Sequence, residues 1–360
     1  MMAAMTDQLH ALAELWAWFG QHQCRGYSPL YERISMAVAS DDELLALVQA
    51  APPAAHMPPA LLAAVHYVLL EGFEHPLADV YAGRSDADPV PLFLDVCRVR
   101  RAKVAALLAT RHIQTNDCGR SALIAPGLTW LAAQLGDQLA LVDVGASAGL
   151  NLLCDRYRID YGEHGATGPA DSAVEIRCRV IGGDPPIARQ LPALVSPVGI
   201  DRAPVDLRRP EDARWLLACV WPDTGRLERT AASIRLAQES LPRLVAGDAN
   251  DVLPAVLSDL PVATVAIVVT TWAFAYLSLE QRRRFVEILE IESHRRPIAW
   301  LSAEGAGVVE AFAHESAYRH DETQSDVLGA VVIRRGDFRA QLLGYVHQHG
   351  SWIDWRAARP

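Results

Sequence analysis

The residues from 139 to 151, LALVDVGASAGLN, combine the side chains and the spacing most suited to chemistry. An apolar run ends at Asp143, and a turn of small residues follows in which Gly145 and Gly149 flank Ser147. Small residues let the backbone approach a ligand closely, and a helix that starts in such a turn presents unpaired N–H groups to a negative group. The Asp143 carboxylate would accept hydrogen bonds from an ammonium or hydroxyl of that ligand. We therefore predict a strand, a ligand-binding turn and the start of a helix.

Two later aspartates follow apolar runs in the same way. The run Val-Gly-Ile before Asp201 predicts a short strand whose terminal carboxylate can accept two hydrogen bonds at once. The run Leu-Val-Ala-Gly before Asp248 predicts another, although a turn in which Asp248 caps the next helix explains the same residues. Asp160 is the rival of Asp201, because it follows Asp143 at a spacing more usual in nucleotide-binding folds. We favour Asp201, since Gly-Ile-Asp is the better match to a strand end.

The order of these segments resembles class I S-adenosylmethionine-dependent methyltransferases. Their first motif is an acidic residue followed by Gly-x-Gly-x-Gly, and Ser147 stands here in place of the middle glycine. The resemblance implies that Asp201 binds the ribose hydroxyls and that Asp248 contacts the adenine amino group. The cofactor-binding residues implied in this way are Asp143, Gly145, Ala146, Ser147, Gly149, Asp201, Asp248, Ala249 and Thr270. The function implied is methyl transfer from S-adenosylmethionine to a small-molecule acceptor.

Other segments qualify this resemblance. Methyltransferases that act on DNA or protein amides often carry Asn/Asp-Pro-Pro-Tyr/Phe after the fourth strand, where this chain has TTWAFAY at 270–276. The chain also resembles a bacterial family catalogued only as a domain of unknown function. The segments that carry this second resemblance are 145–151, 199–207, 215–223, 247–251 and 349–352. It implies the fold and no substrate.

The same turn supports a second interpretation, because Gly-x-Ser147-x-Gly is also the nucleophile-elbow pattern of α/β-hydrolases. The chain order Ser, Asp, His is met with Asp248 or Asp259 and then His347 or His349. The helical character of the preceding residues, and the lack of an HGGG-like segment before the turn, count against an esterase. A third interpretation is a module that binds S-adenosylmethionine or a nucleotide without catalysis, since no base on the acceptor side is identified.

Four residues are candidates for chemistry on the acceptor side: His349, His347, Glu304 and Tyr276. Either histidine could take a proton from an acceptor oxygen or nitrogen. No third ligand lies close to them in sequence, so we predict no metal site. Glu304 ends a predicted strand and could enter the substrate side of the cleft. Arg120 could reach the methionyl carboxylate of the cofactor or an acidic substrate, although a helix-capping turn explains its segment equally well.

The elements that must position these residues change in character along the chain. Residues 1–112 show helical spacing of apolar residues, interrupted by proline pairs, and we predict a helical region that closes as a lid over the substrate. Residues 113–360 alternate strands and helices, which predicts an open, mostly parallel α/β sheet of the class I methyltransferase (Rossmann-like) type. Within it we expect a β-hairpin insertion at 157–181. The predicted strands are 139–144, 195–200, 244–246, 262–269, 298–301, 327–334 and 338–346, and the helices are 121–135, 210–220, 226–241 and 279–294.

Composition narrows the class of protein. With 33 basic and 43 acidic residues the formal net charge is −10, which argues against a partner bound by neutralising phosphates. Six scattered cysteines fit reduced thiols in the cytoplasm better than a disulfide framework. The N-terminus lacks a signal-peptide pattern, and the uncharged stretch 260–279 is typical of a buried strand and loop rather than a membrane helix. We therefore expect a cytoplasmic protein with a small-molecule substrate and no nucleic-acid or membrane partner, its oligomeric state left open.

Overall fold

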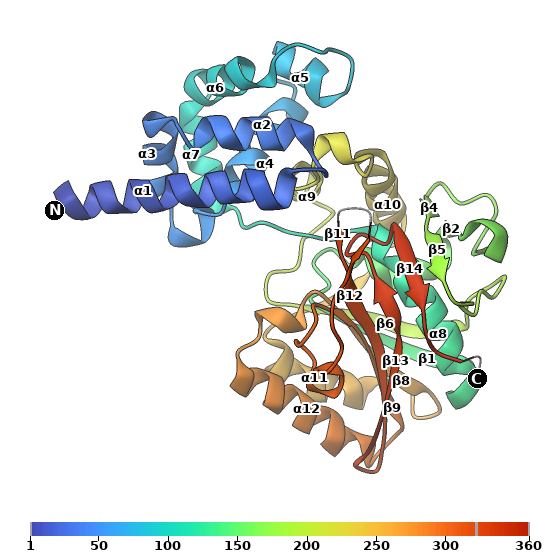
Figure 1. Ribbon diagram of the computed structural model, residues 1–360. Coiled ribbons are helices and arrows are strands. Elements are labelled where there is room, and N and C mark those ends of the chain that lie inside the picture. Colours follow the sequence, from blue (N-terminus) through green and yellow to red (C-terminus); the bar gives the residue numbers. More distant parts are fainter. Residues whose placement is uncertain (1, 321–322, 359–360) are drawn as a thin grey trace. The chain divides into compact units, whose positions relative to one another are not determined.

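Figure 1 presents the computed structural model, which describes residues 2–320 and 323–358. The chain divides into two compact units. Unit 1 comprises residues 1–115 and 208–231, and unit 2 comprises residues 116–207 and 232–360. The sequence placed a single boundary after residue 112 and assigned 208–231 to the α/β domain. The structure instead gives the helical unit a second, later segment of chain.

Unit 1 is built from helices whose starts are set by proline. Pro29, Pro58 and Pro89 each open a helix, where the missing N–H of proline costs no intrahelical bond. The proline pairs that interrupt the sequence pattern therefore mark helix starts. The elements are α1 (Met2–Phe19), the π-helix η1 (Gly20–Cys24), α2 (Pro29–Val38), α3 (Asp42–Gln49), η2 (Pro53–Ala55), α4 (Pro58–Leu70), α5 (Pro76–Tyr81), α6 (Pro89–Val99), α7 (Arg101–Thr110), α9 (Pro210–Ala218) and η6 (Pro222–Thr224).

The late segment of unit 1 joins its hydrophobic core through α9. Trp215 and Ala218 belong to the same buried cluster as α4, which is apolar almost all round. The indole N–H of Trp215 donates to the carbonyl oxygen of His112 at 2.6 Å, and the buried His66 ring contacts the Ala218 carbonyl oxygen at 3.1 Å. Burial of this aromatic anchor explains why 208–231 leaves the α/β unit.

Unit 2 contains the predicted large sheet. Among the described residues the strand order is β5-β14-β13-β12-β9-β8-β1-β6-β7. The five strands from β7 to β9 are parallel to one another, and β12, β13 and β14 follow as antiparallel neighbours. Their bounds are β1 (Gln138–Val144), β5 (Arg179–Gly182), β6 (Ala193–Asp201), β7 (Arg243–Ala246), β8 (Val265–Thr271), β9 (Ile298–Glu304), β12 (Asp326–Arg334), β13 (Asp337–Val346) and β14 (Trp352–Trp355). The predicted α/β class, the mostly parallel sheet and the helical N-terminal region are confirmed.

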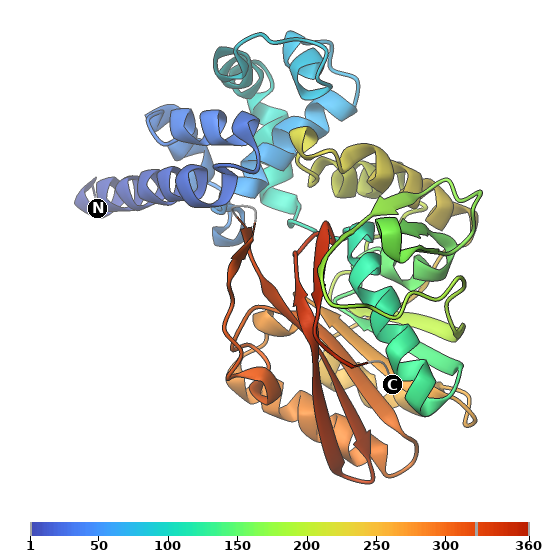
Figure 2. The same cartoon turned by 45° about the vertical axis from the view of Figure 1, so that its right-hand side comes forward.

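Helices cover both faces of this sheet, as Figures 1 and 2 show. On one face α11 (Ala249–Asp259) and α12 (Leu279–Ser293) pack against alternate strand residues such as Val142 and Trp300. On the other face α8 (Ser121–Leu135) approaches so closely that a Cβ at Gly127 would lie 2.7 Å from a methyl group of Leu301. The helix α10 (Leu227–Glu239) and the 3₁₀ helices η3 (Cys118–Arg120), η4 (Leu150–Arg156), η5 (Gly162–His164), η7 (Phe274–Tyr276) and η8 (Glu310–Phe312) complete the helical elements. Because strand residues alternate between faces, Asp143 lies on the α8 face with Leu139 and Leu141.

The insertion after β1 differs from the predicted hairpin. The expected partners within 157–181 do pair, but β2 (Arg158–Asp160) and β4 (Glu175–Arg177) run parallel, and β3 (Ala166–Thr167) pairs antiparallel with β2. These strands form a separate three-stranded sheet, and β5 then crosses to the large sheet beside β14. A parallel pair cannot be closed by a tight turn, so the prediction of a hairpin was wrong. The short pair β10 (Arg319–His320) and β11 (Thr323–Gln324) completes the strands.

No helix in the described part of the chain is long and apolar enough to cross a membrane. The uncharged stretch 260–279 forms the buried strand β8 and the loop with η7, as the sequence predicted.

Candidate functional site

The predicted site residues lie at one edge of the large sheet. Strands β1, β6 and β7 are parallel neighbours, so their carboxyl ends meet there, carrying Asp143, Asp201 and, two residues beyond β7, Asp248. Thr270 lies beside Val144 at the end of β8 on the same edge. Glu304 ends β9, and Asp326 begins β12 opposite this end. The sheet therefore brings the aspartates to a common edge.

Asp143 is the least satisfied polar group at this edge. Its side chain is 2 % exposed, and neither carboxylate oxygen has a hydrogen-bond partner among the described residues. Burial raises the pKa of Asp143 from 3.8 to about 7, the positive charge of Arg120 opposes this rise, and Asp201 adds to it. A carboxylate in such a position needs hydrogen-bond donors, because an unpaired buried polar group is costly.

The turn after β1 is folded tightly on itself. Gly145 and Gly149 adopt positive φ angles of 81° and 76°, and Ser147 does so at 53°, where a non-glycine residue is uncommon. The Ser147 hydroxyl is buried, with no partner in the described structure. The backbone N–H of Ser147 donates to Asp201 at 2.8 Å.

This turn does not start an α-helix, which corrects the sequence prediction. It leads into the 3₁₀ helix η4, which is kinked at Leu153. The N–H groups of Gly145 and Ala146 donate to the Ile200 carbonyl oxygen, and that of Leu150 donates to the Asn116 side chain at 3.0 Å. Because these donors are already used, the turn offers a phosphate little of the N–H cradle that nucleotide-binding turns provide.

The other aspartates have protein partners. Asp201 accepts from the N–H groups of Ser147 and Ala203, both at 2.8 Å. Asp248 forms an ion pair with Arg202 and caps α11 through the Asn250 N–H at 3.0 Å. The capping role that the sequence left open for Asp248 is therefore present.

Asp160, the rival ribose ligand, ends β2 in the small three-stranded sheet. It accepts a hydrogen bond from the Gly162 N–H at 2.9 Å. The large sheet therefore brings Asp201, and not Asp160, to the edge where Asp143 lies.

The loop that precedes α8 is organised around this edge. The Asn116 side chain accepts the Leu150 N–H, and the Asp117 side chain accepts the Gly119 N–H at 2.8 Å. Oδ2 of Asp117 also lies 3.0 Å from Nδ1 of His349. Arg120 is 7 % exposed and donates from Nη1 to the Thr271 carbonyl oxygen at 2.8 Å. Sequence reasoning singled out Arg120 in this loop but missed Asn116 and Asp117, because their partners lie far away in the chain.

The loop after β8 carries a strained residue that the sequence did not identify. Trp272 has a φ of 53°, its indole N–H donates to Asp326 at 3.0 Å, and the Arg120 guanidinium lies 4.6 Å from its ring centre. Burial raises the pKa of Asp326 to about 6, whereas the Trp272 hydrogen bond and Arg120 oppose this. A bulky residue stays at positive φ only when its surroundings hold it there, and such strain often accompanies function.

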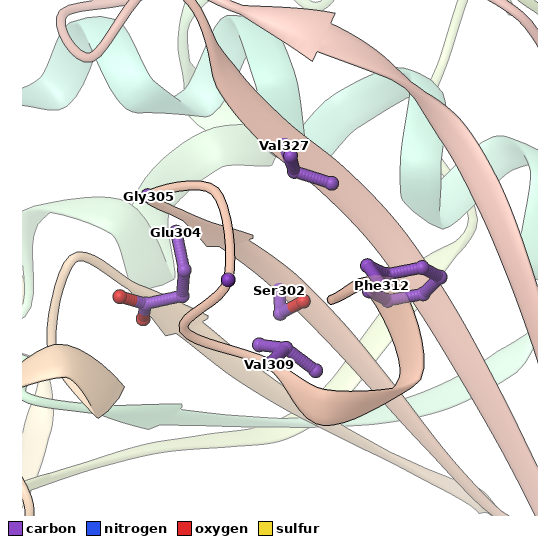
Figure 3. Close-up of a pocket in the computed structure, with 7 residues that line it drawn as sticks. Ser302, Glu304, Gly305, Val309, Phe312 and Val327 are labelled. Carbon is purple, nitrogen blue, oxygen red and sulfur yellow. The ribbon is translucent and has the colours of Figure 1, made fainter. Parts of the chain in front are cut away.

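Glu304 has a positioning role at the base of this loop. Its buried carboxylate accepts from the N–H groups of Ala273 and Phe274, at 3.1 and 2.9 Å. Burial raises the pKa of this carboxyl group. Figure 3 shows the carboxylate turned away from Phe312 and from the hollow between them. That hollow has no room for even a water molecule, so it is not a small-molecule pocket.

The remaining acceptor-side candidates differ in placement. His347 and His349 follow β13, which ends at the same edge, and the His349 backbone N–H donates to Nδ1 of His347 at 3.1 Å. Tyr276 is 84 % exposed. The Thr270 hydroxyl accepts from the indole N–H of Trp300 at 3.0 Å, and Ala249 is buried in the first turn of α11.

The catalytic triad expected of a hydrolase is not assembled. Ser147 Oγ has no partner among the described residues, so no histidine contacts it. Asp248 is engaged by Arg202, and Asp259 pairs with Arg243 at the opposite end of β7. His349 is bound to Asp117, a residue that the predicted triad did not include.

Comparison with known proteins shows the family. A family described as "Uncharacterized protein conserved in bacteria (DUF2332)" matches residues 13–355. The chain belongs to this family. No curated protein and no solved structure matches the chain. The description of the family names no activity.

Proposed function

We propose that unit 2 binds S-adenosylmethionine at the carboxyl edge of β1 and β8 and transfers its methyl group to a small-molecule acceptor. The observation that carries the proposal is Asp143, a buried carboxylate without a hydrogen-bond donor beside the turn after β1. The cofactor's ammonium, adenine amino group and ribose hydroxyls are all hydrogen-bond donors. Any of them would supply the donor that the Asp143 carboxylate does not find in the protein.

The order of the parallel strands supports this location. Read from β7 through β6, β1 and β8 to β9, the strands follow the chain order 3-2-1-4-5. In open sheets of this order, ligands bind where the order reverses, at the carboxyl ends of the first and fourth strands. Those strands are β1 and β8 here, so the class I methyltransferase (Rossmann-like) fold is the finer assignment that we propose for the sheet.

The donor and acceptor inventory favours this ligand over a phosphorylated nucleotide. The N–H groups of Gly145, Ala146 and Ser147 are engaged within the protein. The side chains of Asp143 and Asp201, near the carboxyl ends of β1 and β6, are carboxylates. A phosphate seated at the turn itself would meet these two carboxylates and few backbone donors. Asp201 keeps acceptor capacity for ribose hydroxyls, because a carboxylate offers about four acceptor sites and two are used. Both carboxylate oxygens of Asp248 already accept hydrogen bonds from the protein, so we expect Asp248 to contribute less to cofactor binding than Asp143 and Asp201.

The chain's own contribution to the reaction would be positioning and proton acceptance. When bound, the cofactor supplies an activated methyl group, and its sulfide needs no acid to leave. Asp143 and Asp201 would hold the ligand, and Glu304 fixes the loop of Trp272 over the same edge. Asp117 contacts Nδ1 of His349 and orients its ring, so the other ring nitrogen of His349 would accept a proton from an acceptor oxygen or nitrogen. Alignment of the reacting atoms is the main contribution that such a site can make to the rate.

Isothermal titration calorimetry of the full chain with S-adenosylmethionine tests this proposal. We expect saturable binding that Asp143→Ala and Asp201→Ala each weaken at least about 10-fold, the loss expected when hydrogen bonds to a charged group are removed. Asp259→Ala is the matched control, because that carboxylate lies at the opposite edge of the sheet and should leave affinity unchanged.

Undetectable binding at millimolar ligand would contradict the proposal. Binding without methyl transfer to any of a broad panel of acceptors would favour the non-catalytic binding module instead.

A further inference from the structure

We infer that Arg120 and Asp143 together bind the carboxylate and the ammonium of an α-amino acid, a zwitterion that carries both charges on one carbon. This goes beyond the proposed function, because such a site needs no nucleoside. The observation behind it is a pair of opposite charges, both buried in unit 2, that each retain unused hydrogen-bonding atoms.

Arg120 offers a binding edge for a carboxylate. It lies at the start of α8, and Nη1 is used by the Thr271 carbonyl oxygen. Nε is buried and has no partner among the described residues. The ring of Trp272 supports the guanidinium plane from one side, at 4.6 Å. A guanidinium held flat in this way presents parallel N–H groups that match the two oxygens of a carboxylate.

Asp143 offers the matching site for a cation. Each of the two groups shifts the pKa of the other, so their charges interact, yet no ion pair joins them within 4.0 Å in the described structure. Direct contact would be the simplest way to satisfy two buried charges, and its absence leaves the Asp143 carboxylate and Nε of Arg120 without a hydrogen-bond partner in the described structure. A ligand with one charge would satisfy one partner and repel the other, whereas a zwitterion satisfies both.

The neighbouring charged groups do not replace such a ligand. Arg120 also lies within the electrostatic reach of Asp117 and Glu304. Asp117 is bound to His349 and the Gly119 N–H, and Glu304 is bound to backbone N–H groups. On the other side, Asp201 adds negative charge near Asp143, which favours the cationic end of a ligand there.

Two sources could supply this chemistry: the methionyl end of S-adenosylmethionine, or a free amino acid. Calorimetry on the full chain separates them with three probes. These are S-adenosylhomocysteine, which has the nucleoside and the zwitterion, 5′-methylthioadenosine, which has the nucleoside alone, and L-methionine, which has the zwitterion alone. The comparison within the wild-type protein needs no variant, so it does not depend on how a substitution folds.

We expect S-adenosylhomocysteine to bind on the order of 30-fold more tightly than 5′-methylthioadenosine, because only the former makes charge-assisted hydrogen bonds to this pair. Arg120→Lys, which keeps the charge and loses the planar fork, and Asp143→Asn should each weaken S-adenosylhomocysteine far more than 5′-methylthioadenosine and so remove most of that difference. Arg243→Gln and Asp259→Asn, an ion pair at the opposite edge, are the matched controls.

The outcomes separate this inference from the proposed function. Binding of L-methionine without either nucleoside supports the zwitterion site and contradicts the proposed function. Equal affinity for the two nucleosides, with no binding of L-methionine, overturns the zwitterion site and leaves the proposed function standing. A preference for S-adenosylhomocysteine that both variants preserve would also overturn it, because Arg120 and Asp143 would then not be its cause.

Discussion

Replacing Asp143 with asparagine should remove a loss of stability that the unliganded wild-type protein undergoes as the pH rises from 3.8 to about 7, and should have no pH-dependent effect below that window. The carboxyl group is buried without hydrogen-bond donors, so its charged form is disfavoured in the folded state. Below the pKa that Asp143 has in the unfolded chain, the carboxyl group is protonated in both the folded and the unfolded state. The free energy of unfolding therefore does not change with pH there on account of this group. As the pH rises, the unfolded chain releases the proton first, and the free energy of unfolding falls.

The size of this effect follows from the shift in pKa. Between the ordinary value of 3.8 and about 7, the folded state keeps a proton that the unfolded state has lost. Stability therefore falls by about 1.4 kcal/mol for each pH unit in this window, or about 4 kcal/mol in total, and is constant above it. From pH 5 to pH 8 the expected loss is about 3 kcal/mol, and Asp143→Asn should abolish it because an amide does not ionise.

Urea denaturation at pH 5 and pH 8 measures the change, with Asp259→Asn as the control carboxylate. Comparing the two pH values removes the pH-independent cost of burying an amide. We expect the variant's advantage over wild type to grow by about 3 kcal/mol from pH 5 to pH 8. The same difference at both pH values would show that Asp143 ionises normally and would refute the reasoning.

Three further outcomes are expected. Glu304→Gln should lower the free energy of unfolding by about 1–3 kcal/mol in thermal denaturation, because a neutral amide weakens the hydrogen bonds that Oε1 accepts from Ala273 and Phe274 and places an NH2 group against the Ala275 N–H; an unchanged melting temperature would contradict this. Gly350→Ala should lower the free energy of unfolding by about 2 kcal/mol or more, because φ is 70° and the new methyl group would collide with the Gly119 carbonyl oxygen. Wild-type stability of this variant would show that the chain around Gly350 does not pack against Gly119. Ser147 should resist a fluorophosphonate probe, since its hydroxyl is buried and no histidine contacts it, and rapid labelling read by mass spectrometry would favour the esterase.

Local signals predicted the elements of unit 2 closely. The helix α8 begins and ends at the predicted residues, Ser121 and Leu135, because its apolar spacing is continuous up to Gly136. The pair β12 and β13 turns at Arg335 and Gly336, which both have positive φ, as a two-residue hairpin turn requires. Alternation of strands and helices was then enough to predict a mostly parallel sheet.

The contacts that give the site its character depend on distant partners and were not predicted. Trp272 and Asp326 meet because β8 and β12 lie on either side of β9 in the sheet. Local sequence does not determine this strand order. The helix expected after the glycine turn does not form, because the chain is kinked at Leu153 and enters the small sheet at β2. The aspartates at strand ends could be predicted, since an apolar run followed by an acidic residue needs no partner to be recognised.

The most direct test of the account is a crystal structure of the protein grown with S-adenosylhomocysteine. We expect ligand density at the carboxyl ends of β1 and β8, with a donor of the ligand in hydrogen-bond contact with Asp143 and with the backbone path of the turn at Ser147 unchanged. Ligand density anywhere else on the protein, with Asp143 still lacking a partner, would contradict it.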